Sequence, residues 1–571
     1  MSQTVSHRDP ESPEIPERNL RGSVSPWLLR GMLWFLPLAF LIAAFFYPLS
    51  RILAITFDYR TLSSENIVLA ADVLLFTFYQ AALSTLLTLL LGLPAAYLFA
   101  RYDFRGKSLL RALTAVPFML PTVVVAAGFS ALLGPRGLIQ NLFPLSSFNF
   151  IGTLTAILIA HVFYNTTIII RVVGNALSSL DPRLEQTARS LGADPLRVWW
   201  HVTLPILRPS VLAASLLVFL FDFTSFGVIL LLGGSQYATL EVEIYLRVLR
   251  LPNLPLAALL SIIQLVCTLV ISLLYTRLAT RSAVQTAPRS AEANIRQPKT
   301  LREKFFVTFF VFLLTSFFLL PLSALPFRSL ARLEAERGQR GEVQYGLTTD
   351  YYTELFVNRR GSVFYVPPIR AAVNSLSYAG ATVVLSLLLG FPAALALARP
   401  TRLERILDPL IILPLGSSAV MLGLGFILSY GAWLTSPWLV PFAHTLVALP
   451  FVIRALQPAI ASIPRRLRQA AATLGASPFE VWRHIDLPIL RRAALTAATF
   501  AFTISLGEFG ATLLIARPEY STIPVAIERF LSQPGGLNYG QAMAMATVLM
   551  LLTLFSILLI EKFRIPGSGE F

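Results

Sequence analysis

The chain has 571 residues, of which 55% are hydrophobic and only 13% are charged. A soluble domain carries about 25% charged residues, so this composition excludes an ordinary soluble enzyme or binding module and indicates a membrane protein. The net charge is +16, but the basic residues lie between apolar runs, so we expect no nucleic-acid partner and a lipid bilayer instead. The single cysteine, Cys267, lies inside an apolar run, which excludes a disulfide framework or a thiol-ligated metal site within the chain.

Apolar runs long enough to cross a bilayer, about 20 residues each, recur along the chain. Basic residues gather in every second loop between them, which predicts that those loops and both termini are cytoplasmic. Residues 1–25 are polar and Pro-rich, which predicts a disordered cytoplasmic tail and not a cleavable signal peptide. The sequence thus predicts an all-α polytopic membrane protein with about twelve transmembrane helices, at 31–57, 68–99, 109–133, 151–173, 204–232, 254–279, 304–326, 371–398, 409–433, 437–459, 487–516 and 539–562.

The second half of the chain repeats the first. Gly192 and Gly475 lie 283 positions apart, and the same offset relates His161 to His444, Pro205 to Pro488 and Phe226 to Phe509. Because the charge pattern also repeats, we expect two parallel repeats of about six helices each. The predicted organisation is a tail (1–25), a first repeat (26–279, core about 65–275), a cytoplasmic linker (280–303), a second repeat (304–562, core about 370–560, with a long outer segment at 327–370) and a short cytoplasmic tail (563–571).

Each repeat contains one amphipathic segment between two spans on the predicted inner side. The first is LEQTARSLGADPLRVWWHVTLPIL from Leu184, and the second is LRQAAATLGASPFEVWRHIDLPIL from Leu467. A helix-prone run, a glycine and a second segment capped by Asp194 or Ser477 predict a helix, a break and a short helix. Such a segment suits either the membrane surface or a protein partner. Two copies at one offset favour a partner with two-fold symmetry.

These segments resemble the EAA loop in permease subunits of binding-protein-dependent ABC importers. In that loop E-A-A is followed after three residues by Gly, and after nine more by Ile-x-Leu-Pro. The spacing is matched in both copies, although Gln replaces Glu in each. The matching residues are Gln186, Thr187, Ala188, Gly192, Leu204 and Pro205, and Gln469, Ala470, Ala471, Gly475, Leu487 and Pro488.

The resemblance implies that each segment forms a cytoplasmic coupling helix, and that these twelve residues dock on two copies of a separate ABC ATPase. It also implies an external solute-binding protein and a location in the bacterial plasma or inner membrane. The chain has no GxxxxGK[ST] phosphate loop. We therefore expect ATP and Mg to be bound by the ATPase, and we expect no cofactor, metal site, catalytic residue or enzyme activity in this chain.

Two acidic residues lie in the fifth predicted span of their repeats. By the offset of 283, Asp222 matches Ser505, and Ser225 matches Glu508. A charged group within a membrane helix is costly and usually faces a cavity, so Asp222, Ser225, Ser505 and Glu508 are predicted to line the translocation pathway. A local hydrogen bond, for example between Asp222 and Thr224 or Ser225, is the alternative.

The fused, two-copy arrangement also suggests a cargo. The stretches SFGVILLLGGSQYATLEVEIY and SLGEFGATLLIARPEYSTIPVAI make the chain most similar to the branch of this family that imports ferric iron or thiamine. An ion-gradient-driven secondary transporter also uses two parallel six-helix halves and is the alternative function. Such a transporter works alone and would not need a duplicated docking helix.

Overall fold

The computed structural model describes residues 26–58, 61–142, 150–282, 295–332, 346–357 and 367–563. Over these ranges the chain is built from helices, with two isolated β-bridges and no strand. Eleven helices are long and apolar enough to cross a membrane, or twelve when the bent pair Arg402–Gly416 and Ala419–Trp433 counts as one span. The predicted all-α membrane architecture is therefore confirmed. The predicted tails apart from residue 563, half of the linker and half of the segment 327–370 lie outside the described residues.

The two repeats contain equivalent helices in the same order. The first repeat consists of α1 (Pro26–Leu41), α2 (Tyr47–Thr56), α3 (Ser64–Arg101), α4 (Lys107–Met119), α5 (Thr122–Leu133), α6 (Leu138–Leu142), α7 (Leu154–Ser178), α8 (Pro182–Ser190), α9 (Pro195–Val198), α10 (Leu204–Phe223), α11 (Gly227–Leu232), α12 (Leu240–Leu249) and α13 (Leu254–Ser282). The second consists of α14 (Leu301–Ser329), α15 (Asp350–Thr353), α16 (Pro368–Leu397), α17 (Arg402–Gly416), α18 (Ala419–Tyr430), α19 (Leu439–Ala461), α20 (Arg465–Thr473), α21 (Pro478–Val481), α22 (Leu487–Gly507), α23 (Gly510–Ile515), α24 (Ile523–Leu531) and α25 (Gly536–Phe563).

Four spans that the sequence predicts as continuous are each divided into two helices. The span at 109–133 breaks between α4 and α5 at Leu120 and Pro121, because a proline cannot continue the hydrogen bonding of the preceding helix. Its equivalent at 409–433 bends by 98° between α17 and α18. The spans at 204–232 and 487–516 break before α11 and α23. Each repeat therefore brings two helix breaks into the interior of the protein.

The first helix of each repeat packs on the other repeat. Helices α1 and α2 contact α16 and α18, and α14 contacts α4 and α5. Gly128 of α5 and Gly425 of α18 occupy equivalent positions at these contacts. A Cβ atom on Gly128 would lie 2.8 Å from the Pro321 carbonyl oxygen, and one on Gly425 would lie 2.9 Å from Pro48 Cβ. Only glycine permits these two close approaches, so the repeats are interlocked.

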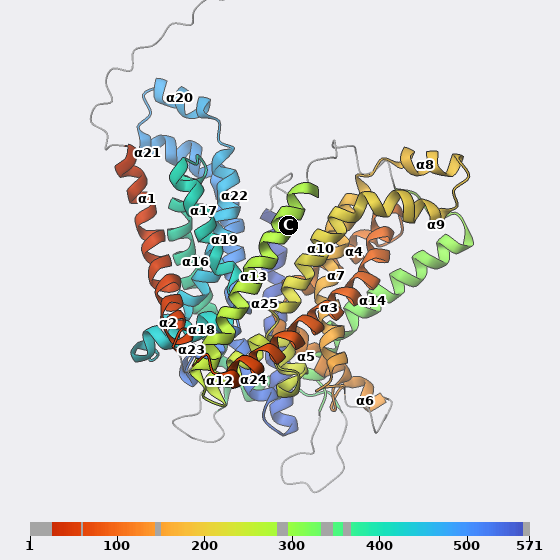
Figure 1. The fold of residues 1–571 in the computed structure, drawn as a ribbon, viewed down its shortest axis with the longest axis horizontal. Helices are drawn as coiled ribbons and strands as arrows, with labels where there is room; N and C mark the ends of the chain where they lie inside the picture. The colour runs from red at the N-terminus through yellow and green to blue at the C-terminus, as the bar shows by residue number, and fades with distance from the viewer. Residues whose placement is uncertain are drawn as a thin grey trace, which may run out of the picture.

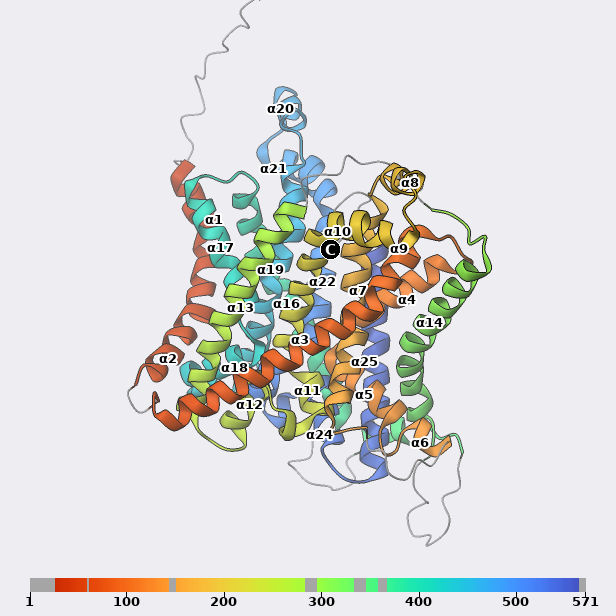
Figure 2. The same ribbon diagram turned by 45° about the vertical axis from the view of Figure 1, so that its right-hand side comes forward.

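The repeated segments lie together at one end of the molecule. Figures 1 and 2 show α8 and α9 of the first repeat and α20 and α21 of the second at this end, which we call the loop end. Helix α1 also begins there. Helices α6, α12 and α24 lie at the opposite end (Figures 1 and 2). The arrangement places equivalent elements of the two repeats at the same end, as parallel repeats require.

Candidate functional site at the repeated loops and the buried polar clusters

The two repeated loops, residues 181–204 and 464–487, have the predicted shape of helix, glycine and short helix. Gly192 and Gly475 end α8 and α20 with φ angles of +86° and +84°. No heavy atom lies within 4 Å of a Cβ placed on either glycine, so the left-handed backbone and not close packing requires glycine here. Asp194 and Ser477 cap the short helices, as predicted, through the backbone N–H groups of Arg197 and Glu480.

The short helices run directly into the next spans. Single π-helical turns, η2 (Trp199–Thr203) and η7 (Trp482–Asp486), join α9 to α10 and α21 to α22. Helical structure therefore continues through Leu204 and Leu487 into α10 and α22. Each short helix is therefore continuous with the long helix that follows it.

Both loops expose large apolar side chains. Leu191 and Leu474, which precede the two glycines, are 84% and 88% exposed. Trp200 of the first loop is also exposed, as is Phe479 of the second, whose ring stacks on Trp482 with centroids 5.9 Å apart. Exposed apolar groups rimmed by polar residues mark surfaces that bind another molecule.

The residues matched to the EAA pattern have the same environment in both loops. Gln186 and Gln469 are exposed, and their side chains make no hydrogen bond with any described residue. Ala188 and Ala471, two positions later, are half-buried against the rest of the loop. The two glutamines are thus equally accessible, and their contact with an ATPase stays a prediction.

Different ionic contacts hold the two loops closed. In the first, Glu185 accepts hydrogen bonds from Arg101 at the end of α3 (2.5 Å) and from Thr203 (3.1 Å). In the second, Arg468 and Asp486 form an ion pair at 2.8 Å. Arg468 is equivalent to Glu185, and Asp486 to Thr203. The first loop is therefore bonded to the membrane helix α3, whereas the ion pair of the second loop joins two residues of that loop.

A cluster of polar side chains is buried in the first repeat around His161 of α7. The His161 Nδ1 atom lies 3.0 Å from Ser84 Oγ and 3.3 Å from Asp222 Oδ1, and its Nε2 atom lies 2.9 Å from Ser225 Oγ. Asn165 donates a hydrogen bond to Asp222 Oδ1 at 2.7 Å. Asp222 Oδ2 has no hydrogen-bond partner among the residues that the structure describes. The cluster joins α3, α7 and α10 where α10 ends.

The second repeat contains the equivalent cluster around His444 of α19. The His444 Nδ1 atom lies 2.7 Å from Ser505 Oγ, and its Nε2 atom lies 2.7 Å from Thr512 Oγ1 and 3.2 Å from Glu508 Oε2. Glu508 also accepts hydrogen bonds from the backbone N–H groups of Ala511 (2.8 Å) and Thr512 (3.0 Å). Glu508 therefore caps the first turn of α23 as well as contacting the histidine.

The acid and the serine exchange places between these two clusters. Asp222 and Ser225 contact His161 from the positions that Ser505 and Glu508 occupy around His444. Asp222 is fully buried, and Glu508 is almost so. Asp222 accepts its side-chain hydrogen bond from Asn165 of α7, whereas the hydroxyl groups of Thr224 and Ser225, which the sequence offered as local partners, contact the Leu220 carbonyl oxygen and His161. Lining of the pathway by these four residues stays a prediction.

Two phenylalanines at equivalent positions meet between the repeats. Phe226 and Phe509, each directly before a glycine that opens α11 or α23, have ring centroids 5.4 Å apart. A contact between equivalent residues places them at the pseudo-two-fold axis. Each histidine cluster fixes the helix break that carries one of these rings. The two rings thus meet where the helix breaks of the two repeats face each other.

Comparison with known proteins agrees with this geometry. Residues 88–284 and 386–563 each match the family described as "Binding-protein-dependent transport system inner membrane component". The chain belongs to this family. The two matches confirm the duplicated permease core, and together with the membrane helices they indicate a multi-pass protein of the inner membrane.

Three relatives align with this permease over most of their length. The thiamine transport system permease protein ThiP of Haemophilus influenzae is 29% identical over 510 residues, which are 85% of this chain and 87% of the relative. ThiP of Brucella abortus is 28% identical over 497 residues, 85% and 86% of the two chains. A probable ABC transporter permease, y4fN, of Sinorhizobium fredii is 26% identical over 512 residues, 86% and 88%.

The permease also contains a buried acid that the sequence analysis missed. Glu241 of α12 accepts hydrogen bonds from Gln264 of α13 at 2.7 Å and from Ser418, the residue that caps α18. It therefore joins the first repeat to the second. The residue equivalent to Glu241 in the second repeat is Pro524, so comparison of the repeats does not single out this acid. Only its apolar surroundings in ATLEVEIY indicated that it is buried.

Proposed function

We propose that this chain forms the translocation pathway of an ABC importer whose cargo is thiamine, and that its repeated loops dock on two copies of a separate ATPase. The observation that carries the proposal is the pair of equivalent, solvent-exposed leucines, Leu191 and Leu474, on loops that continue without a break into membrane helices. A partner that moves these loops moves α10 and α22 and the helix breaks at their far ends. This connection supports coupling of ATP hydrolysis to the pathway.

The proposed orientation places the loop end in the cytoplasm. The first loop carries Arg183, Arg189 and Arg197, and the second carries Arg466 and Arg483, in agreement with the positive-inside rule. The termini then also lie in the cytoplasm, and the opposite end receives solute from an external binding protein. ATP and Mg are bound by the ATPase, and this chain contributes no catalytic group.

Thiamine is proposed as the cargo because relatives that align over most of the chain carry that function in their names. Ferric iron remains the second candidate from the sequence. Membership of the binding-protein-dependent family favours an ATP-driven importer over an ion-gradient-driven transporter. The uptake experiment below distinguishes ATP hydrolysis from an ion gradient as the energy source.

The docking proposal is tested with a Leu191→Asp, Leu474→Asp double variant. We expect the wild-type chain to co-purify with two copies of the ATPase, and the variant to lose them because a buried, unpaired carboxylate opposes docking. Leu301→Asp is the matched control, since Leu301 is 85% exposed at the first residue of α14, outside both loops. Retention of both ATPase copies by the double variant would contradict the proposal.

The cargo is tested in proteoliposomes that contain the chain with its ATPase. We expect uptake of labelled thiamine that requires ATP and the external binding protein, and no uptake driven by an ion gradient alone. Uptake of ferric iron in place of thiamine would correct the cargo and leave the ATP-driven mechanism intact. Uptake without ATP, driven by a gradient, would support the secondary-transporter alternative.

A further inference from the structure

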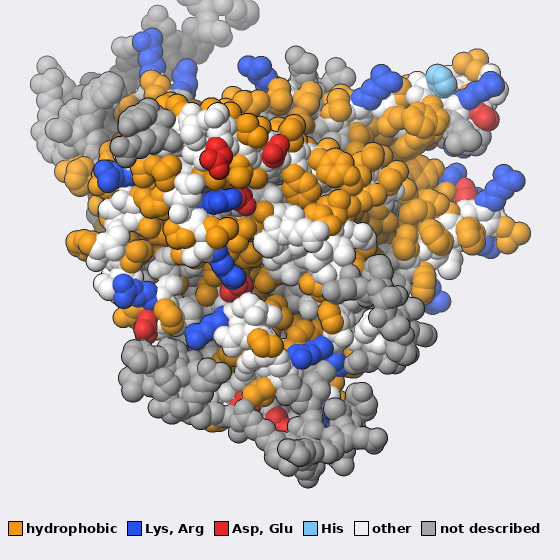
Figure 3. All heavy atoms as spheres, turned by 60° about the horizontal axis from the view of Figure 1, so that its bottom comes forward, with side chains coloured by type: hydrophobic (Ala, Val, Ile, Leu, Met, Phe, Trp, Pro, Cys, Tyr) orange, Lys and Arg blue, Asp and Glu red, His pale blue; other side chains and the backbone are white. Residues whose placement is uncertain are grey.

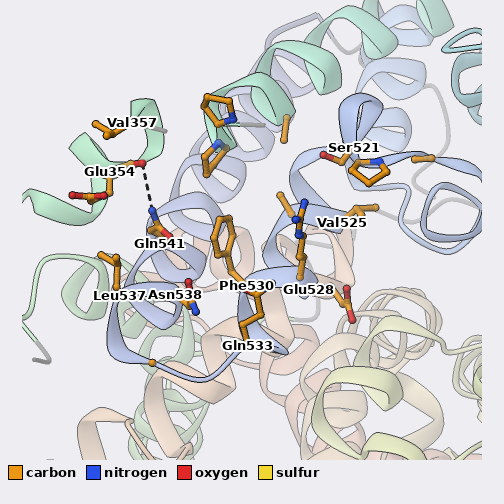
Figure 4. A pocket seen from close by; sticks show the side chains of 18 of the residues that line it. Glu354, Val357, Ser521, Val525, Glu528, Phe530, Gln533, Leu537, Asn538 and Gln541 are labelled. Carbon is orange, nitrogen blue, oxygen red and sulfur yellow. Dashed lines mark hydrogen bonds between the residues drawn. The ribbon is translucent and has the colours of Figure 1, made fainter. Parts of the chain in front are cut away.

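The surface opposite the loop end carries both acidic and basic side chains. Figure 3 views the molecule from this end and shows the two kinds scattered among apolar side chains. A pocket of about 470 Å³ opens there in the second repeat (Figure 4), and its lining contains Glu354 and Glu528 as well as Arg517 and Arg529. Neither the surface nor the pocket therefore indicates a charged ligand.

Glu241, by contrast, is an acid in the interior. It lies in the first turn of α12, is only 1% exposed and makes no ion pair with any residue that the structure describes. Its two carboxyl oxygens instead accept hydrogen bonds from Gln264 Nε2 at 2.7 Å and from Ser418 Oγ. The backbone N–H of Val420 is a further donor to the carboxyl group. Because burial of a carboxyl group is costly, this acid calls for a role.

The contacts of Glu241 lie on a helix break of the second repeat. Ser418 caps α18, directly after the bend of 98° that separates α17 from α18. Thr268 of α13 contacts the other side of the same bend, where its Oγ1 atom lies 2.5 Å from the Gly416 carbonyl oxygen. Polar side chains of the first repeat therefore hold this break of the second repeat from both sides.

The equivalent break of the first repeat is held differently. There Tyr164 and Thr167 of α7 donate hydrogen bonds to carbonyl oxygens at the end of α4 and within it, so the contacts come from the same repeat. The equivalent residues of the second repeat are Val447 and Pro450, whose side chains have no donor. The second repeat therefore cannot hold its own break in this way, and Glu241 supplies the missing contact.

The Glu241–Ser418 pair occurs on one side of the molecule. The residue equivalent to Glu241 is Pro524 of α24, and Pro121 precedes α5 as Ser418 precedes α18. Helix α24 contacts α5, just as α12 contacts α18. A proline side chain neither donates nor accepts a hydrogen bond, so the two repeats are joined by a buried carboxyl group on one side of the pseudo-two-fold axis and not on the other.

The start of α18 supports the aromatic contact between the repeats. A Cβ atom on Gly510, the first residue of α23, would lie 3.0 Å from Ala419 Cβ and 3.3 Å from Val420 Cγ2, so the first turns of α18 and α23 touch. Phe509 precedes Gly510, and its ring meets the Phe226 ring with centroids 5.4 Å apart. The position of the Phe509 ring thus depends on where α18 begins.

The helix that carries Glu241 also contacts the other ring of this pair. Tyr245 lies one turn after Glu241 in α12, and its ring meets the Phe226 ring with centroids 5.6 Å apart. Helix α12 therefore contacts Phe226 directly and is joined to Phe509 through Ser418 and the first turn of α18.

We propose that Glu241 is a positioning residue of the translocation pathway: by fixing the start of α18 it keeps Phe509 against Phe226 and closes the pathway while no ATP is hydrolysed. The inference rests on the proposed function, in which this chain forms the pathway. Hydrogen bonds and not charge carry the effect, because both carboxyl oxygens have donors and the structure describes no cationic partner for them. Removal of the carboxyl group leaves these donors buried without an acceptor.

The test measures ATP-independent release of trapped, labelled thiamine from proteoliposomes that contain the chain with its ATPase. For Glu241→Ala we expect release to be about fivefold faster than for wild type, the factor that corresponds to loss of an aromatic contact of about 1 kcal/mol. Ser418→Ala, which removes one donor, changes release in the same direction. Glu243→Ala is the matched control and leaves release unchanged, because Glu243 is also buried in α12 but forms its ion pair with Arg247 of the same helix.

Two further variants separate positioning from a general loss of stability. Glu241→Gln keeps release at the wild-type rate, because the new amide accepts from Ser418 and donates to Gln264 Oε1, an oxygen for which the structure describes no partner. In the Glu241→Ala, Phe226→Ala double variant release stays at about fivefold, since both substitutions act on one ring contact. Independent effects would instead multiply to about 25-fold.

The inference and the proposed function fail differently. Wild-type release from Glu241→Ala, fast release from Glu241→Gln, or multiplied effects in the double variant would each overturn the positioning role while ATP-driven uptake by the wild type stands. A wild type that takes up no thiamine with ATP and the binding protein overturns the proposed function instead. Co-purification of the ATPase with each variant shows that the chain is folded, and Ser418→Ala replaces Glu241→Ala in both comparisons if the latter loses the ATPase.

Discussion

The two buried acids are predicted to contribute unequally to stability, although both contact a histidine. Glu508→Ala removes the acceptor of two backbone N–H groups at the start of α23 and the contact with His444. Asp222→Ala removes one hydrogen bond from Asn165 and the contact with His161. It also removes Asp222 Oδ2, a buried oxygen for which the structure describes no partner.

These contacts set the expected magnitudes. Loss of a helix cap costs about 1 kcal/mol, and each buried donor left unsatisfied costs about 1–3 kcal/mol, so we expect Glu508→Ala to lower the free energy of unfolding by about 3–5 kcal/mol. For Asp222→Ala we expect about 1–2 kcal/mol, because removal of an unpaired buried oxygen offsets part of the lost hydrogen bond. A difference of about 2 kcal/mol is about 30-fold in the unfolding equilibrium.

The assay is unfolding in mixed detergent–SDS micelles, followed by tryptophan fluorescence. A double-mutant cycle with His444→Ala and Glu508→Ala measures the part that belongs to their contact. Equal destabilisation by the two alanine variants, or greater destabilisation by Asp222→Ala, would refute the reasoning from α23 capping. A change in the concentration dependence of thiamine uptake without a change in stability would instead support the predicted role of either acid in the pathway.

Three further outcomes follow from the contacts described above. Arg101→Ala should lower the free energy of unfolding by about 3 kcal/mol, because the side chains of Arg101 and Glu185 are only 7% and 17% exposed. Arg468→Ala should lower it by about 1 kcal/mol, because the Arg468 side chain is 29% exposed. Thermal melting of the two variants compares these effects. Gly192→Ala should strain the left-handed backbone by about 1–2 kcal/mol and reduce thiamine transported per ATP, with Gly192→Asn less affected. Phe226→Ala should raise passive leak of small solutes from proteoliposomes about fivefold, since an aromatic pair contributes about 1 kcal/mol, and Phe226→Leu should leak less.

The sequence predicts the long-period features of this fold well. Apolar runs locate the spans because a bilayer imposes a minimum helix length. The offset of 283 locates both repeated loops, and the glycine at each centre fixes where α8 and α20 end. The capping roles of Asp194 and Ser477 were also predictable, since a cap depends on residues within three positions.

Features that depend on contacts between distant residues could not be predicted in the same way. The breaks before α11 and α23 lie inside segments that hydrophobicity predicts as single spans, and Glu508 reveals its capping role only when its neighbours are in place. Glu241 binds Ser418, which is 177 positions away and in the other repeat. The offset correctly identifies His161 and His444 as equivalent. The residues next to each histidine in the sequence did not indicate that Asp222 and Glu508 contact them from different positions of the repeat.

The first helix of each repeat packs on the other repeat, so the two sequence repeats are not two separate packed units of the permease. Helices α1 and α2 pack on α16 and α18, and α14 packs on α4 and α5, so each packed unit contains helices from both repeats. The ionic contacts of the two loops differ as well, because Glu185 binds Arg101 of α3 whereas the Arg468–Asp486 ion pair lies within the second loop. The first loop is therefore joined to α3 by an ion pair and to α10 through η2, whereas the second is joined to α22 through η7. If an ATPase docks on both loops as proposed, we therefore expect it to act unequally on the two sides of the permease.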